Sequence, residues 1–260
     1  MGEWWGRAVG LRIFALLLLF GSFAGCSGAV SPGGEPPPPD PDPWEPMNRK
    51  IFWFNEQVDH YVLEPAAIGW DWVLPDPVER SISHFFDNVR FPIVAGNDLL
   101  QGKPRAAATE TGRFLVNTTV GVAGFFDPAT SLGLERHPED FGQTLGWWGA
   151  PPGPYLVLPL LGPTNVRDTA GLLGDYPLSV APFFVNQYIL LGARVADTVN
   201  TRARFLEEVR DARDAALDFY VFSRHAYTKS RAAKVNDATQ MTTEQQDDLY
   251  YFENGSEQEE

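Results

Sequence analysis

The residue with the clearest chemistry is Cys26, the single cysteine of the 260-residue chain. It follows an uncharged apolar run at 13–20 that is preceded by two arginines, and small residues lead into it. This order is typical of a secretory signal peptide and its cleavage site. Phe23–Cys26 resembles a lipobox, with phenylalanine where leucine is usual. We therefore expect cleavage after residue 25 and acylation of Cys26, with an ordinary signal peptide or a membrane-spanning anchor as less favoured alternatives.

The other common reactive constellations are missing from the sequence. The four histidines, His60, His84, His137 and His225, do not have a metal-ligand spacing such as H-E-x-x-H. After residue 25 there is no G-x-S-x-G elbow, no P-loop and no dinucleotide glycine fingerprint. We expect no enzymatic activity, no metal and no cofactor. A hydrolase stays an alternative, because a triad is assembled by geometry rather than by sequence order.

The charge balance also restricts the partners. Loss of Arg7, Arg12 and Glu3 with the signal peptide reduces the 20 basic and 34 acidic residues to 18 and 33, a net charge of −15. Such a surface repels nucleic acid. With Cys26 acylated, no thiol is left for a disulfide, so stability depends on packing or on a membrane.

The segment 141–193 is unusually poor in charge. Its only charged side chains are Arg167, Asp168 and Asp175, among eight glycines and seven prolines. No apolar run reaches the 18 residues of a spanning helix. The segment is either a tightly packed core or protein in the membrane plane with its broken backbone buried or lining a cavity. We expect Arg167 and Asp168 each to be paired, as structural ties or as groups that polarise a lipid path.

The spacing of apolar residues predicts a mainly α-helical body. The first helix is expected over 46–62, with Pro65 as its end, and the second starts from Asp76 as N-cap. Further helices are expected over 92–100, from 103 to 121, around Arg167 after Gly162, and over 193–221. In the last of these, Arg204–Glu208 and Arg210–Asp214 have the spacing of i,i+4 ion pairs. One short β-hairpin is expected at about 143–158, with strands at 143–148 and 155–158 and a turn at 149–154.

The chain is predicted to have four parts. A lipoprotein signal peptide (1–25) is followed by the lipidated cysteine and a proline-rich linker (26–43) that favours polyproline II. A helical domain (44–235) comes next. The polar, acidic stretch 236–260 is predicted to be a disordered tail.

Several sequence blocks carry a family resemblance. They are DPWEPMNR at 42–49 with IFWFN at 51–55, NDLLQG at 97–102, and RFLVNTTVG at 113–121 with FDPA at 126–129. The fourth block is DFGQTLG at 140–146 with GPY at 153–155, LP at 158–159, Gly162, Arg167 and Asp168. These blocks resemble the MlaA family, also called VacJ, of outer-membrane lipoproteins. The match covers about residues 42–230, in order and with suitable spacing.

The resemblance implies a ring of membrane-plane helices with an amphipathic central channel, at the periplasmic face of the outer membrane. Such proteins remove mislocalised phospholipid from the outer leaflet and pass it to a soluble periplasmic lipid carrier (MlaC-like), and they associate with a trimeric porin. Outer-membrane sorting agrees with Ser27, rather than aspartate, after the cysteine. A structural or porin-accessory lipoprotein and a lipid hydrolase are the alternatives.

The segment 141–168 and one aromatic face are the expected channel lining. The residues chosen are Trp53, Phe54, Phe141, Gly142, Thr144, Gly146, Gly153, Tyr155, Arg167 and Asp168. The three glycines would let the backbone pack closely or turn sharply there.

Overall fold

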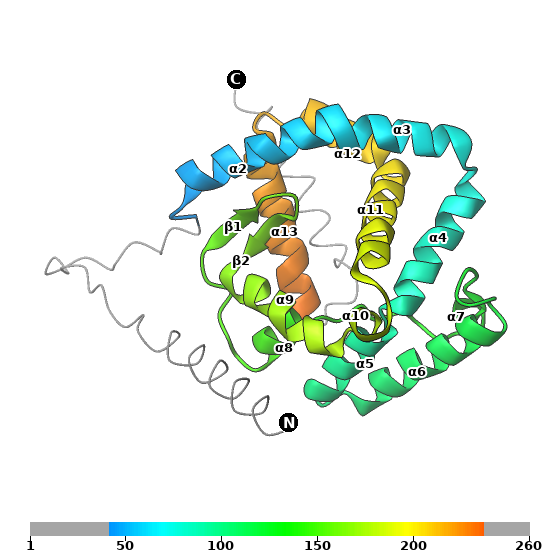
Figure 1. Cartoon of the computed structure of the whole chain (residues 1–260). Helices are drawn as coiled ribbons and strands as arrows, with labels where there is room; N and C mark the ends of the chain where they lie inside the picture. The colour runs from blue at the N-terminus through cyan, green and yellow to red at the C-terminus, as the bar shows by residue number, and fades with distance from the viewer. Residues whose placement is uncertain (1–41, 237–260) are drawn as a thin grey trace, which may run out of the picture. The chain divides into compact units, whose positions relative to one another are not determined.

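The computed structural model describes residues 42–236 (Figure 1). Cys26, the predicted signal peptide, the predicted linker up to residue 41 and the predicted tail beyond Asn236 lie outside the described residues. The elements are α2 (Glu45–Val58), η2 (Asp59–Leu63), α3 (Glu64–Val73), α4 (Asp76–Val89), α5 (Phe91–Leu100), α6 (Pro104–Thr119), α7 (Pro128–Ser131), α8 (Phe141–Trp147), β1 (Tyr155–Leu158), β2 (Gly162–Asn165), α9 (Val166–Leu178), α10 (Ala181–Phe184), α11 (Gln187–Arg204), α12 (Leu206–Ala215) and α13 (Phe219–Val235). The described unit is mainly α-helical, as predicted.

The helices of this unit follow one another around a ring (Figure 1). In that view α2, η2 and α3 form one rod along the top, α4 descends on one side, and α5 and α6 lie at the bottom. The hairpin, α8 and α9 make the opposite side, where α8 packs against α9. Helix α11 packs against α3 and α4, and α13 contacts α8 and β2.

The top rod departs from the prediction that Pro65 ends the first helix. Pro65 lies in the first turn of α3, and the π-helical turn η2 joins α2 to α3 without a break. Proline lacks an N–H and clashes with the carbonyl four residues before it, so it normally interrupts a helix. Here the bond from Glu64 N to Asp59 O widens the turn just before the proline, which accommodates its ring.

Helices α5 and α6 have the predicted bounds within one or two residues. Each has a proline in its first turn, where the missing N–H is not needed. Helix α4 begins at Asp76, but Pro75 takes the N-cap position and no side chain caps the helix, so the prediction of Asp76 as N-cap was wrong.

The single helix predicted over 193–221 is wrong, because α11, α12 and α13 cover this region with two breaks. The first break is at Phe205, and the second precedes Asp218, whose carboxylate caps α13 by accepting from the backbone N of Tyr220 and Val221. The predicted pair Arg210–Asp214 is replaced by a bond of 2.9 Å from Arg210 to Glu64 on α3.

The expected hairpin is half right. Tyr155–Leu158 is a strand, but its antiparallel partner is β2, with Tyr155 opposite Asn165. The predicted strand at 143–148 is instead helix α8 and its C-cap, because Asp140 caps this segment as a helix by accepting from Gln143 N at 2.9 Å. The stretch 149–154 therefore connects a helix to a strand.

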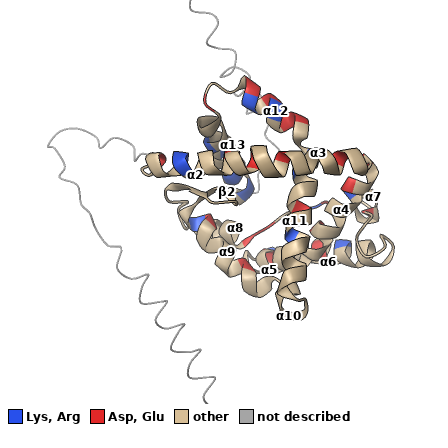
Figure 2. Ribbon diagram, turned by 45° about the horizontal axis from the view of Figure 1, so that its top comes forward, with Lys and Arg blue, Asp and Glu red and all other residues tan. Residues whose placement is uncertain are grey.

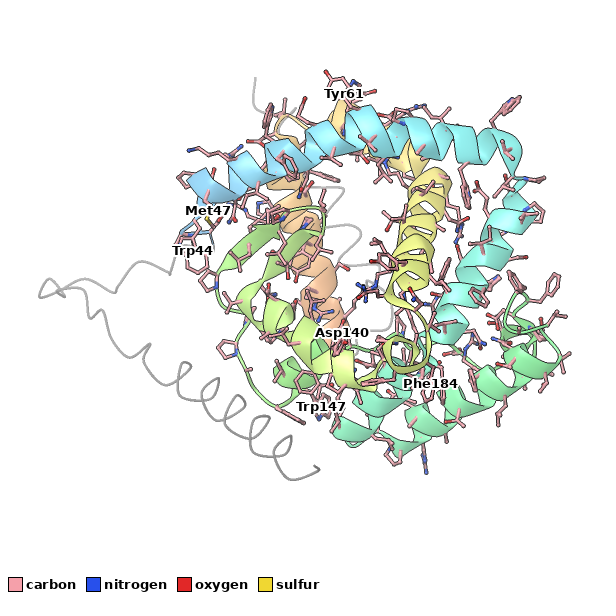
Figure 3. All side chains as sticks on the ribbon, viewed as in Figure 1. Trp44, Met47, Tyr61, Asp140, Trp147 and Phe184 are labelled. Carbon is pink, nitrogen blue, oxygen red and sulfur yellow. The ribbon has the colours of Figure 1, made fainter. Side chains whose placement is uncertain are left out.

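The distribution of polarity differs from that in a water-soluble protein, because 18 of the buried residues in the described unit are polar or charged and nine are apolar. Amide side chains such as Asn48, Asn97 and Asn200 are fully buried, whereas Trp72 and Phe184 are 86% and 84% exposed. Figure 3 shows Trp44, Met47 and Tyr61 at the outer edge of the α2–α3 rod and Asp140 toward the middle of the ring. Figure 2 shows α10 without charged residues, in contrast to the heavily charged α12. Exposed apolar surface of this extent marks contact with a membrane or with other proteins.

None of the helices in the described part of the chain combines the length and the apolarity that a membrane span requires.

Candidate functional site

Glycines bring α8 and α9 into direct backbone contact. A Cβ atom added to Gly171 would lie 2.5 Å from the backbone N of Gly142, and one added to Gly174 would lie 2.1 Å from the ring of Phe141. A Cβ on Gly146 would lie 2.7 Å from the guanidinium of Arg167. The backbone contact at Gly171 therefore requires glycine for packing, whereas at Gly146 the side chains of Arg167 and Val235 would have to shift.

One arginine of α13 joins these two helices. Arg231 Nε lies 2.7 Å from Asp168 Oδ2 on α9, and Arg231 Nη1 lies 2.6 Å from Asp140 Oδ2 at the cap of α8. Asp168 also accepts from Arg167 Nε at 2.9 Å and from the Tyr227 hydroxyl at 2.5 Å. The predicted pairing of Arg167 and Asp168 is thus observed, and both are buried.

The electrostatics of this cluster keep the acids ionised. Burial by itself would raise the pKa of Asp168, but hydrogen bonds from Arg231, Tyr227 and Arg167 outweigh it and hold that pKa below its usual range. The pKa of Asp140 is lowered in the same way, against its burial, chiefly by Arg231. Burial and the carboxylate of Asp168 raise the pKa of the Tyr227 hydroxyl. Asp140 and Asp168 are therefore ionised and Tyr227 is neutral near neutral pH.

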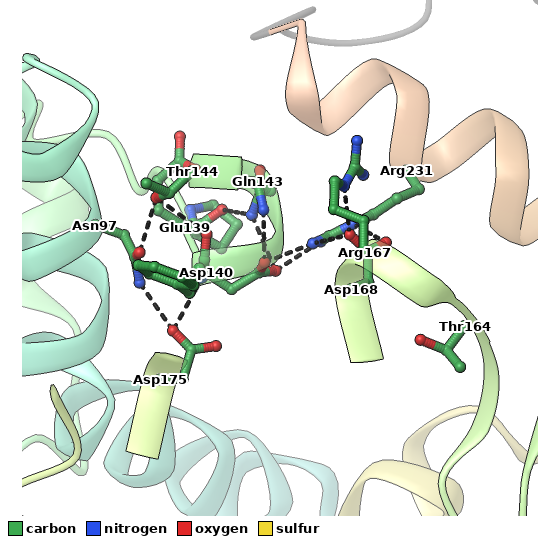
Figure 4. A network of polar contacts seen from close by, with 12 residues as sticks. Asn97, Glu139, Asp140, Gln143, Thr144, Thr164, Arg167, Asp168, Asp175 and Arg231 are labelled. Atoms are coloured by element: carbon green, nitrogen blue, oxygen red, sulfur yellow. Dashed lines mark hydrogen bonds and ion pairs between the residues drawn. The ribbon is translucent and has the colours of Figure 1, made fainter. Parts of the chain in front are cut away.

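The polar network continues from α8 to α5. Thr144 Oγ1 donates to Asn97 Oδ1 at 2.8 Å, and Asn97 Nδ2 donates to Asp175 on α9 at 2.9 Å (Figure 4). Gln101 Nε2 donates to both Glu139 and Thr144. Thr144 and Asn97, both fully buried, therefore together link α8, α5 and α9.

The remaining predicted residues occupy three other environments. Tyr155 is buried in the hairpin against the rings of Tyr220 and Tyr227, and burial raises its pKa to about 12. Gly153 has a φ of +68° in the connection before β1, which favours glycine. Trp53 and Phe54 are exposed on α2, away from the α8–α9 cluster.

An apolar pocket of about 320 Å³ lies beside the hairpin. Phe52, Leu63, Leu161 and Phe219, from α2, η2, the β1–β2 turn and α13, are among its lining residues. The charged side chains at its wall are paired with one another, because Arg202 and Arg213 both bind Asp59, at 2.9 and 2.7 Å. A hydrocarbon chain is the ligand that such a lining favours.

A second pocket, of about 290 Å³, has a charged lining drawn from α4, α5, α6, α8, α9 and α13. Its walls include Arg90, Arg136, Asp140, Asp175 and Lys234. Burial raises the pKa of Asp175, although its bonds from Asn97 and from the backbone of Phe141 oppose the shift. These two pockets therefore differ in the groups that they suit, apolar groups beside the hairpin and polar groups next to α8.

The site residues predicted from the sequence include those of the α8–α9 segment but not most of those that line the pockets. Six of the ten predicted lining residues (Phe141, Gly142, Thr144, Gly146, Arg167 and Asp168) lie together in the glycine-packed cluster. Arg231 and Asp140, which hold this cluster, were not predicted, and neither were the pocket residues Phe52, Leu161 and Arg136. The basic residues of 224–234 were the one sequence signal for Arg231. Within the residues described, no group of histidine, cysteine or acidic side chains is placed to hold a metal.

Comparison with known proteins agrees with this architecture. Residues 40–234 match the family model described as MlaA lipoprotein. A solved structure, described as "Structural basis for maintenance of bacterial outer membrane lipid asymmetry", is similar with a TM-score of 0.66 and 32% identity, over 75% of this chain and 98% of that chain.

Relatives are also found among characterised and uncharacterised bacterial proteins. The "Intermembrane phospholipid transport system lipoprotein MlaA" of Escherichia coli (strain K12) is 35% identical over 228 residues, which is 84% of this chain and 86% of the relative. The protein of the same description from Haemophilus influenzae is 35% identical over 201 residues, 75% and 80% of the two chains. An uncharacterised protein of Rickettsia felis is 37% identical over 195 residues, 75% and 78%.

Proposed function

The chain belongs to the MlaA lipoprotein family, and from this premise we propose that it transports phospholipid between membranes. It removes phospholipid from the outer leaflet of the outer membrane, where it is mislocalised, and so maintains the lipid asymmetry of that membrane. The observation that carries the proposal is the polarity of the unit, whose buried residues are mostly polar or charged and whose surface exposes many large apolar side chains. A body of this kind is suited to lie in the membrane plane and to enclose a polar path.

The physical problem of such transport is the headgroup. Moving a charged headgroup through hydrocarbon without polar partners is costly, whereas the acyl chains are best kept dry. The charged pocket next to α8 offers the headgroup cations and carboxylates, including Arg136 and Lys234. The apolar pocket beside the hairpin offers the acyl chains a lining that includes Phe52 and Leu161. The proposed transport needs no covalent step.

The cluster of α8, α9 and α13 has a supporting role in this proposal. Arg231 and the glycine contacts fix α8, which carries Asp140 and Gln143 into the wall of the charged pocket. Arg167 and Asp168 are then structural ties of the path wall rather than ligands of the lipid. This assignment follows from their burial and mutual pairing.

The anchor, the partners and the side of the membrane belong to the same proposal. Acylation of Cys26 attaches the protein to the outer membrane from the periplasmic side, and the lipid passes on to a soluble periplasmic carrier, MlaC-like. The exposed apolar surface also suits contact with a trimeric porin. Cys26→Ala should leave the protein unprocessed or mislocalised, because acyl chains provide the stable attachment. Normal outer-membrane fractionation of this variant would contradict the anchor.

The first test is surface phospholipid in a strain that lacks the gene, with palmitoylation of lipid A as the readout. Surface phospholipid should rise and return to normal on complementation. Leu161→Asp, which puts a charge into the apolar pocket, should complement poorly, whereas Leu132→Asp, also exposed but outside the pockets described above, should complement better. An unchanged amount of surface phospholipid, with the parent protein expressed in the outer membrane, would favour a structural or porin-accessory protein instead.

A further inference from the structure

A third pocket lies at the corner where α3, α4, α11 and α12 meet, away from the α8–α9 cluster. Its volume is about 550 Å³. The acidic residues of its lining are Asp71, Asp76, Glu79, Glu207 and Glu208, and the basic ones are Arg80, Arg204 and Arg210. The balance of the lining is therefore acidic.

One buried residue of this lining has an unsatisfied carboxylate oxygen. Glu79 is only 3% exposed, and its Oε1 has no hydrogen-bond partner. Its backbone carbonyl is engaged, since it accepts from Asn200 Nδ2 at 3.1 Å and from Ser83 Oγ at 3.2 Å. Buried carboxylates are almost always hydrogen-bonded or paired, because an uncompensated buried charge is costly. A missing ligand that donates hydrogen bonds would resolve this.

The neighbouring charges make the missing ligand a cation. Burial raises the pKa of Glu79, and the carboxylates of Asp71 and Asp76 raise it further. Arg204 opposes this shift only weakly, and its guanidinium donates to Ser83 Oγ at 2.8 Å instead. Arg210 is held by Glu64 on α3. Arg204 and Arg210 therefore leave the carboxylate of Glu79 available.

The surface next to the pocket points to a lipid. Ile68 lines the pocket, and Trp72, one turn further along α3, is exposed. Val78 on α4 is exposed as well. An acidic pocket bordered by exposed apolar side chains suits a molecule with a cationic group close to hydrocarbon. A lysine of a soluble partner would not require that apolar border.

We propose that this pocket binds the primary ammonium group of a zwitterionic phospholipid headgroup. Glu79 accepts from the ammonium inside the pocket, Asp71 and Asp76 flank it, and Arg80 contacts the phosphate. The inference rests on the proposed phospholipid transport and adds to it a second headgroup contact, separate from the charged pocket next to α8, with a headgroup preference. An anionic headgroup is disfavoured, because it would meet a buried carboxylate without a counter-charge.

The test is binding of short-chain lipids to the full acylated protein in non-ionic detergent, by calorimetry. The probes are the dihexanoyl forms of phosphatidylethanolamine, phosphatidylcholine and phosphatidylglycerol. Phosphatidylethanolamine should bind about tenfold more tightly than phosphatidylglycerol, given the usual strength of hydrogen bonds to charged groups. Phosphatidylcholine should also bind more weakly, since its quaternary ammonium cannot donate.

Variants assign this preference to the pocket. Glu79→Gln should remove most of the tenfold preference, and Asp71→Asn, at an exposed position, should reduce it. Glu135→Gln, exposed and outside this pocket, is the matched control and should keep it. Far-UV circular dichroism and thermal unfolding would show that Glu79→Gln is folded.

Four outcomes would overturn the inference. Equal binding of the three lipids would remove the headgroup preference and leave the proposed transport intact. Binding of none of them would count against the transport as well. An unchanged preference in Glu79→Gln would place the selectivity elsewhere. Tighter binding of a tri-lysine peptide, lost in Glu79→Gln, would assign the pocket to a protein partner.

Discussion

Arg231 Nε lies 2.7 Å from Asp168 Oδ2, and this contact joins the last helix of the described unit to helix α9. The same guanidinium reaches Asp140 at the cap of α8, so one side chain connects three helices. At its other end α13 is tied to the start of the unit, where Arg224 binds the buried Asp42 at 3.1 Å. Helix α13 therefore fixes the entry of the chain and the α8–α9 cluster relative to each other.

Arg231→Ala should destabilise the protein strongly. The substitution leaves the buried carboxylate of Asp168 without its main counter-charge, and breaking a buried pair in this way costs about 3 kcal/mol or more. Urea unfolding of the protein in detergent would measure the loss. Lys229→Ala, at an exposed site on the same helix, is the matched control and should change stability by less than about 0.5 kcal/mol. Equal effects of the two substitutions would contradict the role of Arg231.

The same contact predicts how stability depends on pH. The pKa of Asp168 is lower in the folded state than its ordinary value of 3.8, so the unfolded chain binds more protons on acidification. The stabilisation is therefore complete above pH 3.8 and is lost as the pH falls through the folded-state value. Thermal unfolding between pH 2 and pH 6 should show this fall, and Asp168→Asn should flatten it. A wild-type slope retained in Asp168→Asn would assign the acid sensitivity to other carboxylates.

The helices that were predicted well from the sequence are those whose ends are determined by residues close to them in the chain. Pro92 and Pro104 lie in the first turns of α5 and α6, and those starts were correct to about one residue. Pro65 carries the same local signal but does not end its helix. The widened turn before it involves Asp59, which accepts from Arg202, 143 residues further along the chain. A local pattern cannot report a contact of that range.

In the candidate site, too, contacts between neighbouring parts of the chain could be predicted and contacts between distant parts could not. Gly142 and Asp168 were selected from one charge-poor segment, and the structure brings them together, because the packing of α8 on α9 involves neighbouring parts of the chain. The Arg231–Asp140 contact spans 91 residues, and the break before Asp218 that orients α13 was not predicted. The sequence around Glu79 does not distinguish it from an exposed polar residue of a helix. Its burial arises where α11 packs against α4.

Glu79→Gln should stabilise the protein at neutral pH in the absence of lipid. The pKa of Glu79 is raised above its ordinary value of 4.5, so the folded state binds the proton more tightly than the unfolded chain does. The protein therefore loses stability as the pH rises from 4.5 through the folded-state pKa, and the neutral amide removes this loss. We expect a gain of about 1 kcal/mol in the free energy of unfolding at pH 7.5. The gain should shrink below pH 4.5, and a destabilised variant at both pH values would mean that the carboxylate has a partner in solution.

The glycine contact between α8 and α9 gives a test that separates packing from helix propensity. Alanine is the better helix former, so Gly→Ala in an open helical position should stabilise by up to about 1 kcal/mol. Gly192 on α11 is such a position, with no atom within 4 Å of an added Cβ, whereas at Gly171 the added Cβ would lie 2.5 Å from the backbone N of Gly142. Gly171→Ala must push the two helices apart, and overpacking of this kind costs about 1–3 kcal/mol. The midpoint temperature of thermal unfolding should therefore fall for Gly171→Ala and rise for Gly192→Ala.

Because α8 carries Asp140 and Gln143 into the charged pocket, Gly171→Ala should also raise surface phospholipid in complemented cells, and Gly192→Ala should not. Stabilisation by both substitutions would show that the helices can separate freely and that the glycine contact does not hold the pocket wall.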